Sequence, residues 1–311
     1  MVAEKRRMIL RYLLTLALVA AWAIVSRPAA AAPVRIAYSS ISGAMLPLWV
    51  AKERGLFDKH GVDVEVMYVR GVSVEALLSG EVQFIRASPP SVVRSTLKGA
   101  DLVVIANTIN VPVFSLMTTP EIKRPEDLKG RKIGVTNLGD SPDLVLSLIL
   151  EKWGLQRSKD VSVLAIRGGM PELMISAPSN LRGLKLGLRE LVDASTLGIS
   201  YLNSPLSTRR STIKAQRDMV LRVLRGYHEG VQSTRNDRDS TLKILSKYVR
   251  VDNPDILSDV YQIYGSKHLQ ADLSVQPGAV NGLLKGLGAE AAKANPASFV
   301  DTSLLHELHV R

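Results

Sequence analysis

The 311-residue chain contains no cysteine. This absence excludes a disulfide framework, a thiolate metal site, a cysteine nucleophile and a lipid-modified N-terminal cysteine. Histidine is also scarce, with five residues, and the pair in "HELH" (His306 and His309) is not an H-E-x-x-H motif. "GVTNLGD" lacks the G-x-G-x-x-G fingerprint of dinucleotide binding, and no serine has a neighbouring histidine or acid that would mark it as a nucleophile. We therefore expect no metal, no cofactor and no enzymatic activity.

Long apolar runs are missing except near the N-terminus. There the basic "MVAEKRRMILR" is followed by an apolar run, Tyr12–Val25, and then by "SRPAAAAP". This three-part layout predicts a secretory signal peptide over residues 1–32, with cleavage within Ala29–Ala32. An uncleaved membrane anchor is the alternative, although the run is shorter than the about 20 residues that span a bilayer. We expect a periplasmic or otherwise extracytoplasmic protein.

Positive charge is in excess but not concentrated. The formal net charge is +11, of which residues 1–32 carry +4, so the mature chain keeps +7. Lys and Arg are scattered through amphipathic helices and are not interleaved with aromatic residues, as a nucleic-acid surface would require. We expect no nucleic-acid partner.

Strand and helix patterns alternate along most of the chain. The strand-like segments "VRIAY", "VDVEVMYV", "VQFI" and "DLVVIAN" are separated by helical segments, and a second series starts at Phe114 with "FSLMTT", "KIGVT" and "VSVLAI". Such alternation predicts an α/β fold with mostly parallel sheets flanked by helices. We assign residues 33–112 plus 225–311 to lobe 1 and residues 113–224 to lobe 2.

A short sequence occurs in both series. "RASPPSVVR" (Arg86–Arg94) resembles "ISAPSNLR" (Ile175–Arg182), and an Arg-Gly pair precedes each copy. The repeat predicts two similar lobes with equivalent loops, although turn-forming residues can also produce such a likeness by chance. The second copy is shorter, because 9 positions separate Arg167 from Ser176 whereas 18 separate Arg70 from Ser88. Reading "PELM" as helix, we predict that the second lobe lacks one helix–strand element, including a full strand, and that its ligand wall is looser.

Several longer segments carry a family resemblance. "LPLWVAKERGLFDKHGVDVEVMYV", "ALLSGEVQFIRASPPSVV" and "RPEDLKGRKIGVTNLGDSPD" resemble the solute-binding proteins of ABC importers. The branch includes the nitrate, sulfonate, taurine and thiamine-pyrimidine-precursor binders (NMT1/THI5-like, SsuA-like). The resemblance implies a two-lobed type II periplasmic binding protein fold, a hinge, a small-molecule ligand between the lobes, and docking of the closed form on a membrane permease.

The same resemblance leaves other functions open. We expect a monomeric transport protein, and an extracytoplasmic sensor subunit with the same cleft is the main alternative. The fungal thiamine-pyrimidine synthases share the fold, but their Cys-rich motif has no counterpart in a chain without cysteine.

Candidate ligand-binding residues follow the predicted strands, where parallel sheets place their ligand crevices. They are Ser39, Ser40, Ser42, Gly43, Arg70, Gly71, Ser88, Ser91, Asn107, Asn137, Gly139, Asp140, Ser141, Arg167, Gly168, Gly169 and Ser176. Hydroxyls, backbone N–H groups and helix N-termini can hold a polar or anionic group. Ser88, Ser141 and Ser176 can equally cap helices.

Charged side chains bear on the chemistry of the ligand. Arg70, Arg86 and Arg167 lie at or near predicted strand ends and can pair with a carboxylate or sulfonate. Asp140 opposes a simple anion, because it occupies the helix N-terminus that an anion would prefer. Trp49 and Trp153 are expected in the core or at its rim.

Overall fold

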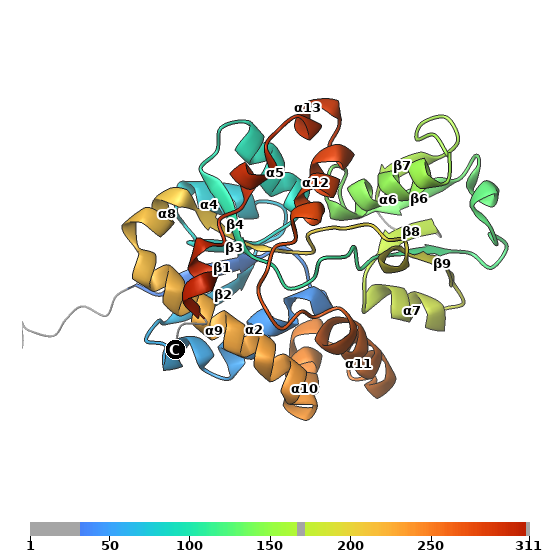
Figure 1. Cartoon of the computed structure of the whole chain (residues 1–311). Coiled ribbons are helices and arrows are strands. Elements are labelled where there is room, and N and C mark those ends of the chain that lie inside the picture. The colour runs from blue at the N-terminus through green and yellow to red at the C-terminus, as the bar shows by residue number, and fades with distance from the viewer. Residues whose placement is uncertain (1–31, 167–171, 309–311) are drawn as a thin grey trace, which may run out of the picture. The chain divides into compact units, whose positions relative to one another are not determined.

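The computed structural model describes residues 32–166 and 172–308, and residues 34–311 form one compact unit (Figure 1). The predicted signal peptide therefore lies outside the described residues, apart from Ala32. In the part of the chain that is described, every helix is too short or too polar to cross a membrane.

The first sheet has five strands in the order β2-β1-β3-β10-β4. Its strands are β1 (Val34–Tyr38), β2 (Val64–Tyr68), β3 (Phe84–Arg86), β4 (Leu102–Ala106) and β10 (Leu206–Arg209). β1 pairs in parallel with β2 and β3, whereas β10 runs antiparallel to both of its neighbours. The parallel strands are joined by α2 (Leu46–Glu53), α3 (Leu56–Lys59), α4 (Ser73–Ser79) and α5 (Pro89–Leu97).

The second sheet also has five strands, in the order β7-β6-β8-β5-β9. Its strands are β5 (Ser115–Thr118), β6 (Lys132–Val135), β7 (Ser162–Ala165), β8 (Glu172–Ile175) and β9 (Arg189–Asp193). β6 pairs in parallel with β7 and β8, and β5 runs antiparallel to β8 and β9. The accompanying helices are α6 (Ser141–Lys152) and α7 (Ser179–Lys185). The predicted α/β fold with two mostly parallel sheets is confirmed.

The two sheets share one strand pattern. In each, one strand (β1 or β6) pairs in parallel with two other strands (β2 and β3, or β7 and β8), and an antiparallel strand (β10 or β5) lies between β3 or β8 and the last strand of the sheet. β3 and β8 therefore occupy equivalent positions, and each is followed by a Ser-Pro loop that leads into a helix. The repeated sequence thus marks equivalent loops of two similar lobes.

The predicted loss of a strand from the second lobe is wrong. Residues 172–174, assigned to a helix from the sequence, form β8 together with Ile175 in the interior of the sheet, with Glu172 and Met174 on its buried face. A short apolar run carries too little periodicity to distinguish a strand from a helix. The predicted absence of the preceding helix concerns residues 167–171, which lie outside the described residues, as do Arg167, Gly168 and Gly169.

The chain returns to the first sheet earlier than expected. β10 lies between β3 and β4, so the return crossing comes before Leu206 and not at residue 224. The C-terminal third contributes helices to both lobes, because α12 (Pro277–Gly286) packs into the hydrophobic cluster of the second sheet. The boundary predicted at residue 224 therefore needs correction, since sequence patterning does not show which sheet a strand joins.

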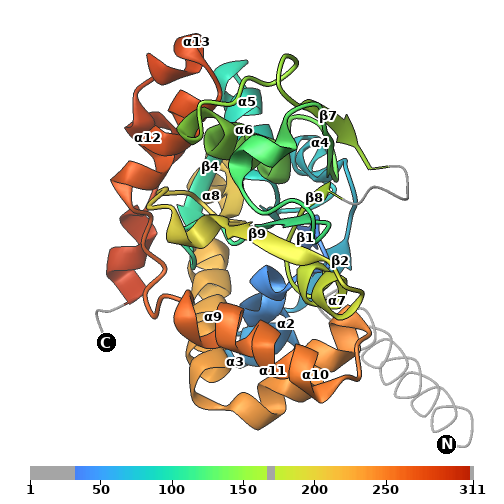
Figure 2. The same ribbon diagram turned by 90° about the vertical axis from the view of Figure 1, so that its right-hand side faces the viewer.

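The main core lies on one face of the first sheet. There α2 packs against α9 (Arg217–Asn236) and α10 (Arg238–Val249), and α11 (Pro254–Tyr261) contacts α10 (Figures 1 and 2). Trp49 is fully buried and stacks on Tyr248 at a ring separation of 4.7 Å, while Trp153 packs against the second core, as expected for both tryptophans. The remaining helices are α8 (Arg210–Ala215) and α13 (Ala289–Ala292).

Candidate functional site

A cleft of about 470 Å³ lies between the loops that follow the strands of the two sheets. Residues from both sheets line it, including the segments after β1, β2 and β3 in the first lobe and after β6 and β8 in the second. A crevice beyond the carboxyl ends of parallel strands is the usual ligand position in such sheets. The volume is typical of a small-molecule site.

Eleven of the residues predicted from the sequence line this cleft. They are Ser39, Ser40, Ser42, Arg70, Gly71, Ser88, Ser91, Asn137, Asp140, Ser141 and Ser176. The fold thus brings together side chains that are more than 100 positions apart in the sequence.

Three other residues predicted to bind the ligand do not line the cleft. Gly43 is buried under Tyr264, and Asn107 is 1% exposed with its amide donating to Ile109 and Asn110. Gly139 forms a turn at φ +85° beside the cleft.

Arg86 was expected to pair with an anion at a strand end but is fully buried. It donates to the Ser204 carbonyl and the Tyr227 hydroxyl. Position after a strand therefore predicts proximity to the cleft but not the direction of the side chain.

The serines at the helix N-termini do not cap their own helices. Ser88 is the N-cap residue of α5, but its side chain makes no capping hydrogen bond there. Its hydroxyl instead accepts from the Ser141 backbone N–H at 3.1 Å, on the opposite side of the cleft. The N-cap residues of α6 and α7 are Asp140 and Pro178, so neither Ser141 nor Ser176 holds that position. The helix-cap alternative is not supported for these serines.

Asp140 links the two sides of the cleft. One carboxylate oxygen accepts from the Ser91 hydroxyl on α5 at 2.8 Å, and the other accepts from the Asn137 amide at 3.0 Å. Arg94, also on α5, donates through both terminal nitrogens to the Gly139 carbonyl at 2.7 and 2.6 Å. We call these four residues, Ser91, Arg94, Gly139 and Asp140, the cleft latch. The carboxylate that was expected to oppose a simple anion is thus engaged by the protein.

A second carboxylate, that of Asp143, stabilises the turn that carries Asp140. Asp143 is 6% exposed, accepts from the Gly139 N–H at 2.7 Å and pairs with Arg157 at 2.7 Å. The positive φ of Gly139 allows the chain to turn sharply before α6. These contacts fix the position of the second-lobe half of the latch.

The walls are rich in hydroxyl groups. Eleven serines line the cleft, together with Thr136 and the amides of Asn137 and Asn203. A hydroxyl can both donate and accept hydrogen bonds, so the walls suit a ligand that carries polar groups of either kind. Arg70 and Glu75 are the exposed charged residues of the lining, and neither forms an ion pair within the described residues.

Aromatic and apolar residues complete the walls. Tyr264, in the π-helical turn Gln262–Lys267, donates to the Val113 carbonyl at 3.2 Å, and burial raises the pKa of its hydroxyl well above the usual range. Tyr264 is therefore neutral and stays a hydrogen-bond donor at any physiological pH. Phe114 and Met174 add apolar surface beside it.

Sequence reasoning missed several lining residues. Arg94 and Ser95 follow Ser88 and Ser91 at helical spacing, so the amphipathic pattern of α5 could have identified them. Tyr68 is the last residue of β2, so the strand-end rule could have identified it as well. Tyr264, Asn203 and Ser204 carry no such signal, because tertiary folding alone brings their segments to the cleft.

Two α/β lobes with a cleft at their strand ends define a periplasmic binding protein fold. The alkanesulfonate-binding protein SsuA from Xanthomonas axonopodis pv. citri, solved with MOPS, superposes with a TM-score of 0.69 at 19% identity over 90% of this chain and 99% of that one. The periplasmic nitrate-binding protein NrtA from Synechocystis PCC 6803 superposes with a TM-score of 0.72 at 16% identity over 89% and 88% of the two chains. These similarities establish the fold.

The chain belongs to the NMT1/THI5-like family, whose family model matches residues 43–240. A Brucella abortus (strain 2308) protein named "Putative binding protein BAB2_1146" is 25% identical over 278 residues, which cover 82% of this chain and 83% of that protein. The resemblance inferred from the sequence is confirmed at the level of the family.

Proposed function

We propose that the protein is an extracytoplasmic substrate-binding protein that captures a small polar organic solute in the cleft and delivers it to an ABC importer. The observation that carries this proposal is the cleft itself, which joins hydroxyl-rich walls from two lobes at the ends of parallel strands. Its relatives by fold include proteins named for binding alkanesulfonate and nitrate. Closure of two lobes around a solute is a known way to couple binding to a downstream event.

The lining favours a solute with several hydrogen-bonding groups and a compact apolar part. Serine hydroxyls and asparagine amides offer partners for donors and acceptors, and Phe114 and Met174 offer apolar contact. The exposed Arg70 at the wall can pair with an anionic group. We propose that the solute contacts the eleven predicted residues that line the cleft, among them Ser39, Ser88 and Ser176.

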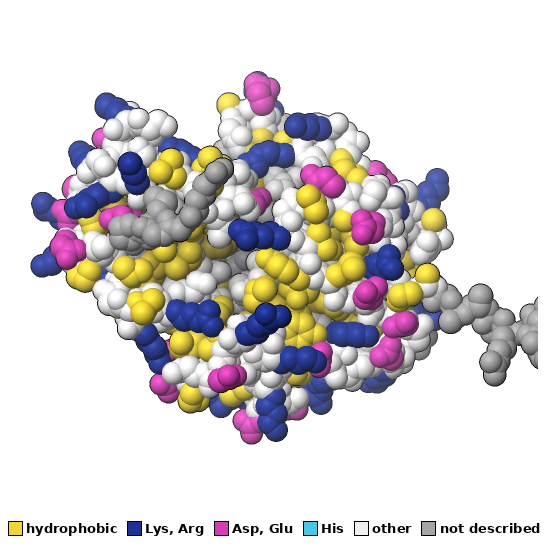
Figure 3. Space-filling view, turned by 180° about the vertical axis from the view of Figure 1, so that it is seen from behind, with side chains coloured by type: hydrophobic (Ala, Val, Ile, Leu, Met, Phe, Trp, Pro, Cys, Tyr) yellow, Lys and Arg dark blue, Asp and Glu magenta, His cyan; other side chains and the backbone are white. Residues whose placement is uncertain are grey.

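The transport assignment also rests on the predicted secretory signal over residues 1–32. We propose that the mature protein works as a monomer in the periplasm and docks on a membrane permease. Figure 3 shows Lys and Arg interspersed with Asp, Glu and hydrophobic side chains over one face, without a large area of one charge. Such a surface fits a soluble carrier better than a nucleic-acid binder.

A thermal-shift screen tests ligand capture. The probes are MOPS, nitrate, succinate, cytosine and putrescine, which represent sulfonates, inorganic anions, carboxylates, aminopyrimidines and amines. A bound solute at about 100 times its Kd stabilises the folded protein by about 2.7 kcal/mol. We expect at least one class to raise the Tm of the mature protein.

A matched pair of variants shows where the solute binds. Ser179→Trp places a large ring at an exposed position that lines the cleft, and Ser162→Trp places the same ring on β7 outside it. Binding in the cleft predicts that Ser179→Trp abolishes the shift and that Ser162→Trp retains it. Equal shifts in both variants, or no shift in the wild-type protein with any probe, would overturn the proposal.

A further inference from the structure

One lining residue lies on the segment that returns from the second lobe to the first. Asn203 follows β9 and precedes β10, and its backbone N–H donates to the Ile109 carbonyl at 3.0 Å. Tyr201 makes the equivalent bond to Asn110 at 3.0 Å, so the outgoing and returning segments are paired. Asn203 thus contributes to the cleft from the connection between the lobes.

The side chain of Asn203 is buried but not satisfied. The residue is 4% exposed and lines the cleft, yet its amide nitrogen has no hydrogen-bond partner within the described residues. An unpaired buried amide costs about 1–3 kcal/mol, so such groups in native structures have a partner or a role. By contrast, the other amide in the lining, Asn137, donates to Asp140.

The next residue holds a strained backbone conformation. Ser204 has φ +57°, in the left-handed region that non-glycine residues rarely adopt. Strain of this kind persists where the surroundings impose it and is frequent at ligand sites. Ser204 also lines the cleft, so the strain lies next to the unpaired amide.

A buried arginine holds the carbonyl group of Ser204. The Arg86 Nε donates to the Ser204 carbonyl at 3.0 Å, and its Nη1 donates to the Tyr227 hydroxyl. Arg86 is fully buried, makes no salt bridge within the described residues, and leaves Nη2 without a partner. Burial lowers its pKa, although an arginine remains protonated in proteins. Its guanidinium also lies 5.2 Å from the centre of the Tyr227 ring, but no described carboxylate pairs with it, and a positive charge behind the cleft favours electron-rich ligand atoms at this wall.

We propose that Asn203 is a specificity-determining residue that donates its amide N–H to an acceptor atom of the solute, and that Arg86 positions it through the Ser204 carbonyl. This inference rests on the proposed function. It selects solutes that present a carbonyl, carboxylate, sulfonate or ring-nitrogen acceptor over solutes that carry only donors. Arg86 is a positioning residue, because its guanidinium lies behind the wall and does not line the cleft.

The test replaces the donor while conserving shape. Asn203→Asp is compared with Asn236→Asp, which makes the same charge change at an exposed position on α9 outside the cleft. Affinities for MOPS, succinate, cytosine and putrescine are measured by calorimetry. A site built around a donor rejects the mismatched group strongly. We expect Asn203→Asp to lose at least about 30-fold in affinity for the acceptor probe that the wild type binds, and Asn236→Asp to stay within about twofold.

Each other result has a distinct meaning. Unchanged affinity in Asn203→Asp, or wild-type binding of putrescine alone, overturns the role of Asn203 and leaves the proposed function standing. Failure of these four probes and of nitrate to bind the wild-type protein overturns the proposed function and the role of Asn203 together.

The positioning role has a separate test, because removal of the buried Arg86 can prevent folding. Ser204→Gly keeps the carbonyl that Arg86 holds but relieves the positive φ. We expect the Tm to rise by about 2 °C, because glycine adopts the positive φ without strain. We expect the affinity for the same acceptor probe to fall about tenfold, because the segment that carries Asn203 gains freedom. A higher Tm with unchanged affinity would show that the strain does not serve binding.

Discussion

The cleft latch makes a quantitative prediction about closure. In Ser91→Ala, Asp140 loses the hydroxyl that donates to its carboxylate at 2.8 Å across the cleft. A hydrogen bond to a charged group contributes about 1.5–3 kcal/mol, and since both residues are half-buried we use about 1.4 kcal/mol. That value corresponds to a tenfold change in an equilibrium constant. We therefore expect the closed-to-open ratio of the solute-free protein to fall about tenfold.

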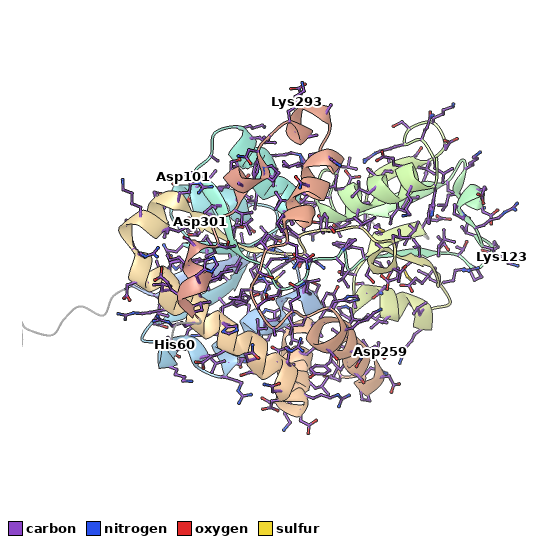
Figure 4. All side chains as sticks on the ribbon, in the orientation of Figure 1. His60, Asp101, Lys123, Asp259, Lys293 and Asp301 are labelled. Atoms are coloured by element: carbon purple, nitrogen blue, oxygen red, sulfur yellow. The ribbon has the colours of Figure 1, made fainter. Side chains whose placement is uncertain are left out.

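The absence of cysteine permits a clean fluorescence assay of this ratio. Two introduced cysteines take donor and acceptor dyes without background labelling. Asp58→Cys lies in α3 beside His60 and Lys123→Cys lies in the second lobe, and Figure 4 shows His60 and Lys123 far apart on the ribbon. Single-molecule energy transfer between the dyes then reports the closed fraction.

Two further variants separate the latch from general destabilisation. Ser266→Ala removes an exposed hydroxyl that does not line the cleft and should leave the ratio unchanged. The double variant Ser91→Ala/Asp140→Asn should show a coupling energy of about 1 kcal/mol, as expected for directly bonded residues. An unaltered closed fraction in Ser91→Ala, or additive effects in the double variant, would refute the latch.

Three more predictions concern stability and export. Burial, aided by Lys267, lowers the pKa of His268, so the unfolded chain binds a proton more readily than the folded protein. The folded protein should therefore lose stability as pH falls below 6.5. Chemical denaturation at several pH values should show that His268→Gln removes this dependence. Gly230→Ala should destabilise the protein by about 1–2 kcal/mol in urea titrations despite its better helix propensity, because the new Cβ would lie 2.6 Å from Ala51; equal or greater stability would refute close packing of α9 on α2. Deletion of residues 2–32 should leave the protein in the cytoplasmic fraction, and export of the deleted form would contradict the proposed signal peptide.

The sequence pattern was sufficient for the layer architecture. Alternating strands and helices predicted two mostly parallel sheets, and the Ser-Pro repeat marked the equivalent loops after β3 and β8. The helix predicted for "PELM" is wrong because so short a segment fits a helix or a strand, and only pairing with β6 and β5 decides between them. Local pattern therefore identified the elements that are long and periodic but not this short one.

The site was predictable where it depends on strand ends. Ser39, Ser88 and Asn137 lie one or two residues after the ends of β1, β3 and β6 and line the cleft. Arg86 lies at the end of β3, but its side chain is buried in the core. The direction of a side chain depends on packing that a single sequence does not reveal. Asn203 was missed for a related reason, since the returning segment reaches the cleft only through tertiary pairing with Ile109.

Native mass spectrometry of the mature protein most directly tests whether the cleft captures a solute. The protein is purified without denaturation and then exposed to the five probe solutes at millimolar concentration. We predict a single one-to-one adduct with a small polar molecule in the wild type and its loss in Ser179→Trp, while Ser162→Trp retains it. Bare wild-type protein under all of these conditions, or an adduct that persists in Ser179→Trp, would contradict ligand capture in the cleft.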